Sequence, residues 1–280
     1  MRDPQDNHGH IVYNVTGADL QGTWEVKRRY NEFFLLHEAL VKRWPGIVIP
    51  CVPPKQAMGN KDIAFLQERR FYLERFIKKV SRYDFIINSQ EFQIFSRPQG
   101  LEVDKSLSKL PKLSNSQLYD RLKEATQTDD ENMTNQDRDI IEIQMNEFMV
   151  FVKKAEPFLK KLKEELATFL SRKQLDMLSY AGTQNMLAEY EETNLRYYTD
   201  NDIDKLVVRN TDANSLLESM RHTVEKLRNP FTDLYHWIKG ELYDLAACLM
   251  ALKERKAVQA NIADLKKKIA GIKSDIESIS

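Results

Sequence analysis

Residues 24–33, with the sequence WEVKRRYNEF, join a strand-like run to the start of an amphipathic helix. Alternation with a period of two puts Trp24, Val26 and Arg28 on one face of the strand and the odd-numbered residues on the other. Three cations end the run and an aromatic residue follows them. Guanidinium groups and a helix N-terminus both attract phosphate, so the stretch predicts an anion-binding corner.

The neighbouring residues predict a small α+β domain. Residues 11–15 favour a strand, residues 17–22 a turn and residues 23–29 a second, antiparallel strand. Asn31 is expected to cap the helix that follows. The apolar residues of this helix recur with helical spacing, as Phe33, Leu36, Leu40 and Trp44. Pro45-Gly46 is expected to end it.

Residues 47–55, with the sequence IVIPCVPPK, form an extended segment that contains three prolines and ends in Lys55. Proline fixes φ and favours a polyproline-like path. The segment is either a rigid wall that presents Lys55 at a pocket or a ligand for an SH3 domain. Its apolar sequence between ordered elements favours the wall.

A strong helix is predicted over residues 63–82, after Asp62. Leu66, Leu73, Ile77 and Val80 form one apolar row, and Phe65, Tyr72 and Phe76 form a second. Arg69 lies within the second row, and burying a cation without a partner is costly. Arg69 therefore either extends past the edge of the row into water or faces a phosphate or hydroxyl-rich ligand. Residues 89–95 predict a last short helical turn.

Three motifs follow one another along the first hundred residues. They are Arg28-Arg29-Tyr30 with Phe33, then Pro53-Pro54-Lys55, then Glu68-Arg69-Arg70 with Leu73, Glu74, Phe76 and Ile77. In this order and at this spacing they resemble the PX (phox-homology) domain of sorting nexins, over about residues 10–98. PX domains usually bind phosphatidylinositol 3-phosphate on endosomes. The family usually begins with another strand, for which the residues before Ile11 leave little room, and it often has proline where Cys51 stands.

The resemblance implies a role for each of four lipid-binding residues. Arg29 would hold the 3-phosphate, Tyr30 would pack on the inositol ring, Lys55 would meet the 1-phosphate and Arg69 would bond the far hydroxyls. The chemistry agrees, because Arg binds phosphate bidentately, Lys acts as a point charge and an aromatic face covers the apolar side of the ring. Arg28 shares a strand face with Trp24 and Val26, which favours a structural role.

Residues 101–135 are polar and predict a linker. Within it, residues 114–125 favour a short helix that carries Leu118 and Leu122 on one side. Such a helix either inserts into a membrane or is a solvated helix that packs on the next domain. The second interpretation is favoured.

Residues 136–280 predict long helices. The first helix has apolar residues alternately four and three apart, which indicates a coiled-coil-like seam. The seam consists of Ile141, Met145, Phe148, Val152, Ala155, Leu159, Leu162, Leu166 and Phe169. Pro157 is expected to bend this helix, which weakens near Thr183 and breaks near residues 199–201.

A second long helix is expected to begin between residues 202 and 214 and to bend at Asn229-Pro230. Its seam consists of Leu217, Met220, Val224, Leu227, Phe231, Leu234, Ile238, Leu242, Leu245, Leu249 and Leu252, and it continues through Ile262, Leu265, Ile269, Ile272, Ile276 and Ile279.

A PX-like domain followed by a linker and long helices resembles the PX-BAR sorting nexins. Residues 155–162, AEPFLKKL, are similar to a run in the first BAR helix of that family. The domains are then residues 1–100, 101–135 and 136–280, an α+β PX domain, a linker and an elongated all-α BAR-like domain. BAR domains are antiparallel dimers of three-helix subunits. Here the third helix is not evident, and the chain would form a homodimer or a heterodimer.

The distribution of charge and of cysteines indicates which kinds of partner the chain can bind. Residues 1–100 carry 15 Lys and Arg against 11 Asp and Glu, whereas the remainder carries 27 against 31. This distribution disfavours nucleic-acid binding and puts the positive excess beside the phosphate-binding corner. Cys51 and Cys248 form no disulfide framework or metal motif. The basic residues Lys253, Arg255, Lys256, Lys266, Lys267 and Lys268 either face a membrane or are solvated, and the latter is favoured.

No catalytic motif is present, so neither an enzyme nor a cofactor or metal is expected. The resemblance implies a cytoplasmic protein bound peripherally to early endosomes and acting in endosomal sorting and protein transport. The alternative is a coiled-coil scaffold whose N-terminal domain binds protein through its proline-rich segment.

Overall fold

A computed structural model describes residues 1, 4–7, 10–55, 62–98, 100, 102–127, 133–197, 222 and 228–279. They divide into two compact units. One unit consists of Met1–Glu156 and Gly240–Ser280, and the other consists of Pro157–Lys239. No helix among the described residues combines the length and the apolar composition that crossing a bilayer requires.

Three antiparallel strands open the first unit. β1 (Gln5–Asn7) pairs with β2 (His10–Asp19), which pairs with β3 (Gly22–Arg29). The sequence left little room for a strand before residue 11, and this expectation was wrong because three residues suffice for β1 to pair with the start of β2. The alternation predicted for β3 is confirmed, since Trp24, Val26 and Arg28 are at least partly buried and the odd-numbered residues are exposed.

Gly17 lies opposite Trp24 in the β2–β3 ladder, and the indole ring covers it. A Cβ at residue 17 would lie only 2.4 Å from a ring carbon of Trp24. The ring itself is held edge-to-face against Phe92 at 6.1 Å between centroids. Glycine is therefore required here for close approach.

Substituting Gly17→Ala is expected to destabilise the domain by about 1–3 kcal/mol, because the indole must leave its packed position. Urea unfolding followed by circular dichroism measures the change. Thr16→Ala, at an exposed position on the same strand, is the control and is expected to change stability by less than about 0.5 kcal/mol. Equal stabilities of the two variants would show that the ring is free to move.

α1 (Tyr30–Arg43) starts directly after β3. The predicted cap, Asn31, is wrong, because Arg29 occupies the cap position and its backbone N–H donates to the Glu32 carboxylate at 2.6 Å. The Asn31 side chain instead donates to Asp104 at 3.1 Å. The predicted apolar row is confirmed, since Phe33, Leu36, Leu40 and Trp44 are all buried.

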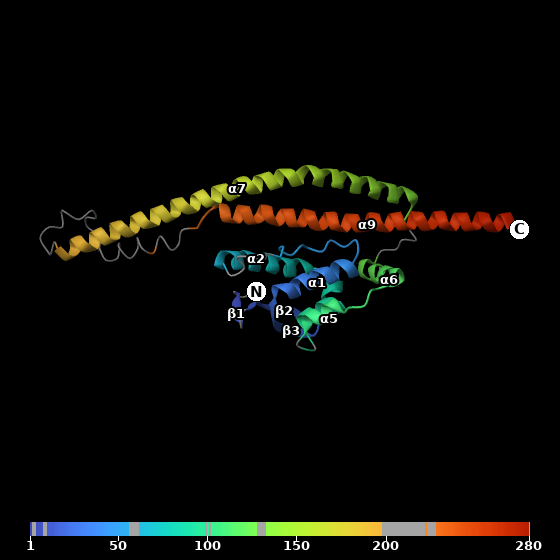
Figure 1. Ribbon diagram of the computed structural model, residues 1–280, viewed down its shortest axis with the longest axis horizontal. Helices are drawn as coiled ribbons and strands as arrows, with labels where there is room; N and C mark the ends of the chain where they lie inside the picture. Colours follow the sequence, from blue (N-terminus) through green and yellow to red (C-terminus); the bar gives the residue numbers. More distant parts are fainter. Residues whose placement is uncertain are drawn as a thin grey trace. The chain divides into compact units, whose positions relative to one another are not determined.

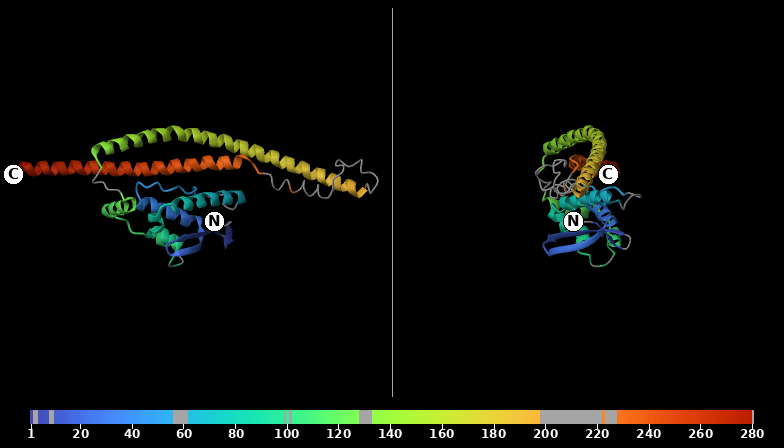
Figure 2. Two further views of the ribbon diagram at one scale, coloured as in Figure 1. Left: turned by 180° about the vertical axis from the view of Figure 1, so that it is seen from behind. Right: turned by 90° about the vertical axis from the view of Figure 1, so that its left-hand side faces the viewer.

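Three further helices complete the predicted domain: α2 (Ile63–Val80), α3 (Asp84–Ile87) and α4 (Gln90–Ser96). The Asp62 carboxylate caps α2 by accepting from the N–H groups of Ala64 and Phe65. The helices α1 and α2 lie over the sheet (Figures 1 and 2). They enclose a core that includes Tyr13, Val15, Phe33, Leu36, Leu40, Leu73, Phe76, Phe92 and Phe95.

The segment predicted as a linker adds two helices to this core. The helix predicted at residues 114–125 is confirmed as α6 (Asn115–Thr126), whereas α5 (Val103–Ser108) was not predicted. Val103 and Leu107 of α5 are buried in the core, and Leu122 and Ala125 of α6 pack against it. α6 therefore packs on the preceding α+β domain, whereas the sequence favoured packing on the next one.

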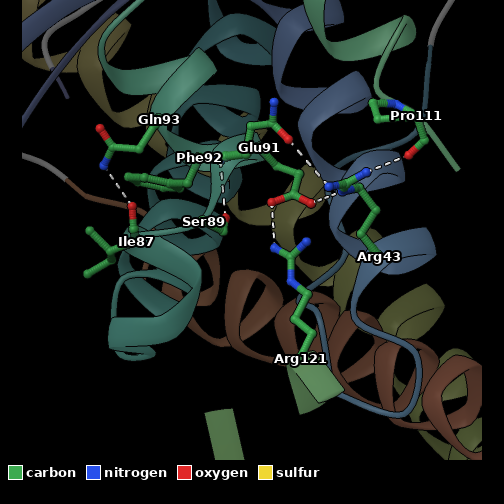
Figure 3. A network of polar contacts seen from close by, with 9 residues as sticks. Arg43, Ile87, Ser89, Glu91, Phe92, Gln93, Pro111 and Arg121 are labelled. Carbon is green, nitrogen blue, oxygen red and sulfur yellow. Dashed lines mark hydrogen bonds and ion pairs between the residues drawn. The ribbon is translucent and has the colours of Figure 1, made fainter. Parts of the chain in front are cut away.

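A buried carboxylate joins these added helices to the domain (Figure 3). Glu91 of α4 is fully buried and forms ion pairs with Arg43 of α1 and, at 2.8 Å, with Arg121 of α6. Arg43 also donates to the Pro111 carbonyl at 2.6 Å. The Arg121 guanidinium lies 3.9 Å above the Trp44 ring. One carboxylate thus fixes α1, α4, α6 and the chain between α5 and α6.

Two helices of more than 40 residues follow, α7 (Asn135–Tyr197) and α9 (Phe231–Ile279). α7 continues through Pro157 and through the predicted weak region near Thr183. The predicted bend at Asn229-Pro230 is instead the start of α9, whose Phe231 N–H donates to the Asn229 side chain at 3.1 Å. The start of the second helix and its seam residues Leu217, Met220, Val224 and Leu227 lie outside the described residues.

α7 and α9 contact each other within each unit. In the first unit, Met145 contacts Arg255, and Asn146 accepts from Lys256 at 3.5 Å. In the second unit, the rings of Phe169 and Phe231 stack at 5.8 Å and Asn229 donates to the Leu170 carbonyl. Several apolar residues of α9 stay exposed, including Val258, Ile262, Leu265, Ile269 and Ile272.

α2 also contacts α9 within the first unit. Arg75 donates to both carboxylate oxygens of Asp244, at 3.0 and 2.5 Å, and the Lys79 ammonium lies 2.5 Å from the same carboxylate. The rings of Tyr72 and Tyr243 meet edge-to-face at 5.1 Å. Burial raises the pKa of Asp244, but the hydrogen bonds from the two cations outweigh it and leave that pKa below its usual value. The carboxylate is therefore charged at neutral pH.

Candidate functional site

The site predicted from the sequence is built around Tyr30, the first residue of α1. Its hydroxyl donates to the Pro53 carbonyl at 2.5 Å, which ties the proline-rich segment to the start of the helix. The Arg69 guanidinium lies 4.2 Å from the centre of the Tyr30 ring. Tyr30 of α1 therefore contacts both the proline-rich segment and α2.

Arg69 is 7% exposed, so it does not extend into water. Its guanidinium lies between the rings of Tyr30 and Phe65, 4.3 Å from the latter. Its Nε has no hydrogen-bond partner among the described residues. Burial raises the pKa of the nearby Tyr13 hydroxyl and the Arg69 charge opposes this rise. Arg69 is thus a buried cation that lies against aromatic faces, and no carboxylate among the described residues pairs with it.

Lys55 is exposed, and its ammonium lies 3.9 Å above the Phe34 ring. The Phe34 ring is in turn 6.5 Å from the Tyr30 ring, so Lys55 and Arg69 flank one pair of neighbouring aromatic side chains. The structure thereby brings together Tyr30, Lys55 and Arg69. Tyr30 and Phe34 are one helical turn apart on α1, which explains why their rings are neighbours.

Arg29 is exposed and adjoins the cluster as the residue before Tyr30. Its position at the N-terminus of α1 lets its side chain and the first N–H groups of the helix act on one anion. Arg28 has the structural role that its strand face predicted. It is buried, and its guanidinium donates to the carbonyls of Phe95 and Lys27, both at 2.8 Å.

Sequence reasoning missed two aromatic residues of this site, Phe34 and Phe65. Phe65 lies four residues before Arg69 on one helix, so its spacing contained the signal for the contact. Phe34 gave a weaker signal. Phe33 and Phe34 are adjacent, only one of them can face the core, and Phe33 is fully buried there.

Two cavities of the first unit are lined by residues outside this cluster. One, of about 580 Å³, is lined by residues of α4 and α5, including Gln93, Arg97 and Lys109. The other, of about 630 Å³, is lined by residues of α1, of the chain after α5, and of α9. None of the four predicted lipid-binding residues lines either of these two cavities.

Comparisons with known proteins match the N-terminal part of the chain. Residues 18–99 match the model of the PX domain. The chain is 33% identical over 92 residues to vacuolar protein sorting-associated protein vps5 of Schizosaccharomyces pombe, which covers 31% of this chain and 16% of that protein. It is 33% identical over 98 residues to sorting nexin-8 of Mus musculus, which covers 35% of this chain and 21% of that protein.

The solved structure of the SNX-BAR Mvp1 tetramer matches all of this chain and 78% of the other, with a TM-score of 0.58 and 18% identity. The chain has the fold of a PX-BAR sorting nexin. The matched sequence spans about a fifth or less of the curated relatives. The PX match ends near α4, so α5 and α6 are additions packed against the PX domain.

Proposed function

We propose that the PX domain of this chain binds a phosphoinositide headgroup through Arg29, Tyr30, Lys55 and Arg69. The observation that carries the proposal is that Arg69 lies against the Tyr30 ring and Lys55 against the neighbouring Phe34 ring, with Arg29 adjoining. Burying a guanidinium costs free energy unless it gains hydrogen bonds and an opposite charge. A phosphorylated inositol ring supplies both, because it carries anionic phosphates and hydroxyl groups that accept from Arg69.

The preferred lipid is phosphatidylinositol 3-phosphate, and the site of action is the cytoplasmic face of early endosomes. Both follow from the resemblance to sorting nexins. Arg29 holds the 3-phosphate, Tyr30 packs on the ring, Lys55 meets the 1-phosphate and Arg69 bonds the distal hydroxyls. The chain acts as a peripheral adaptor in endosomal sorting, not as an enzyme.

The helical remainder supplies the partner surface. Apolar residues of α7 and α9 stay exposed, and antiparallel pairing of two copies, or of this chain with a related one, would cover them. In this proposal the chain consists of a PX domain at residues 1–100, a linker at residues 101–135 and a BAR-like helical domain at residues 136–280. Two engaged PX domains per dimer would raise membrane affinity through a high effective concentration.

The burial of the proline-rich segment disfavours the scaffold alternative. Pro50, Val52 and Pro53 are buried, so Pro54 is the exposed proline of the three. An SH3 domain needs a polyproline face with two spaced prolines. The segment serves the PX domain as the wall that carries Lys55.

Flotation of the full chain with phosphatidylcholine vesicles tests the function. Each vesicle preparation contains one phosphoinositide, and a set with phosphatidylserine at matched charge is the control. We expect flotation with phosphatidylinositol 3-phosphate to exceed that with the charge-matched control by at least about tenfold. Equal flotation with all anionic vesicles would refute a headgroup site and would indicate attraction by surface charge alone.

A further inference from the structure

Contacts near its backbone and at the end of its side chain restrict where Lys55 can lie. Two residues earlier, the Pro53 carbonyl accepts the hydrogen bond from Tyr30. At the other end, the Lys55 ammonium lies 3.9 Å above the Phe34 ring, within the range of a cation–π interaction. An exposed lysine otherwise samples many rotamers, and ordering it upon binding is unfavourable.

Phe34 is suited to this contact by its place on α1. It follows Phe33, which is fully buried in the core and fixes the helix face, and it is itself half-buried. Its ring is 6.5 Å from that of Tyr30. The core packing of α1 therefore orients the Phe34 ring, and the ring in turn limits where the ammonium of Lys55 can lie.

We propose that Phe34 is a positioning residue of the PX site, which holds the Lys55 ammonium where it receives a phosphate of an inositol headgroup. This inference rests on the proposed function and assigns to the site a residue that does not itself meet the phosphate. Phe34 stabilises the binding-competent rotamer of Lys55 in the free protein. The ammonium can then bind the headgroup with less loss of side-chain entropy.

The variants separate a ring contact from general packing. Phe34→Leu keeps an apolar side chain and removes the aromatic face, whereas Phe34→Tyr keeps the face. Lys55→Gln removes the cation, and the double variant Phe34→Leu/Lys55→Gln measures coupling between the two positions. Phe71→Leu, at a phenylalanine of α2 that is 44% exposed, is the matched control.

The first measurement uses the lipid-free full chain. NMR of the Lys55 side chain is expected to show its ε-methylene protons shifted upfield by the Phe34 ring, with the shift lost in Phe34→Leu and kept in Phe34→Tyr. An unshifted ε-methylene in the unsubstituted chain would overturn the contact regardless of any lipid.

The second measurement uses two probes, phosphatidylcholine vesicles with phosphatidylinositol 3-phosphate and soluble inositol 1,3-bisphosphate. We expect Phe34→Leu to weaken binding of both by about two- to fivefold, as for an exposed cation–π contact. Phe34→Tyr and Phe71→Leu should bind like the unsubstituted chain, and Phe34→Leu should add nothing in the Lys55→Gln background. A loss with vesicles alone would contradict the inference, because Phe34 would then act on the bilayer.

The outcomes keep the two proposals apart. If the unsubstituted chain binds both probes and Phe34→Leu binds them equally well, the positioning role is wrong and the proposed function stands. An additive loss in the double variant also overturns the positioning role, because Phe34 would then not act through Lys55. If the unsubstituted chain binds neither probe, the proposed function fails and the role of Phe34 fails with it.

Discussion

Replacing Arg29 with glutamine is expected to weaken binding of the full chain to vesicles with phosphatidylinositol 3-phosphate by at least about tenfold. Hydrogen bonds to charged groups contribute about 1.5–3 kcal/mol each, and a guanidinium binds phosphate with two of them. Arg29 is exposed at the N-terminus of α1, so the substitution removes charge from the site without opening the core.

Flotation and isothermal titration with soluble headgroup measure this loss. Arg82→Gln is the matched control, because Arg82 is an exposed arginine of the same domain that follows α2. The control should bind normally and both variants should unfold at the same temperature as the unsubstituted chain. Flotation of Arg29→Gln at the level of the control would mean that the phosphate site lies elsewhere.

Replacing Glu91 with glutamine is expected to have the largest effect on stability, a loss of about 3–5 kcal/mol. The substitution removes a fully buried negative charge and leaves the guanidinium groups of Arg43 and Arg121 without it. Urea unfolding of the full chain, followed through the tryptophans, measures the loss. Glu102→Gln, which breaks an exposed pair with Lys105, should cost less than about 1 kcal/mol.

The same carboxylate predicts a pH dependence. Burial alone would raise the pKa of Glu91, but the hydrogen bond and charge of Arg121, with the charge of Arg43, hold it below its ordinary value of 4.5. The stabilisation is therefore fully present above about pH 4.5 and is lost as pH falls through the lowered pKa. Stability of the unsubstituted chain should drop more steeply below pH 4.5 than that of Glu91→Gln. Parallel pH profiles would show that Glu91 keeps an ordinary pKa.

Much of the fold was predictable because burial follows regular spacing over long elements. The alternating face of β3 and the rows that begin at Phe33 and Leu66 were predicted and are at least partly buried. The elements that were missed, β1, α3 and α5, have three, four and six residues. Such short segments contain fewer than two periods, and tertiary contacts such as those of Val103 and Leu107 decide their structure.

The site was predicted from residue types, but not the contacts that arrange it. Arg69 was recognised as a cation in an apolar row, and Phe65 four residues earlier gave the helical spacing for its contact. The contact between Lys55 and Phe34 depends on how the proline-rich segment folds back on α1, which no local pattern shows. The partners of Glu91 are likewise distant in the chain, 48 and 30 residues away.

The docking of α2 on α9 has a consequence for how the molecule meets a membrane. Arg69 of the proposed lipid site and the α9 contacts Tyr72, Arg75 and Lys79 all belong to one continuous helix. A helix of 18 residues is stiff. A headgroup bound at Arg69 and the Asp244 carboxylate bound by Arg75 would therefore keep a fixed spacing along α2. A headgroup bound at the proposed site would therefore also set the direction, relative to the membrane, of the α9 segment that belongs to the same unit.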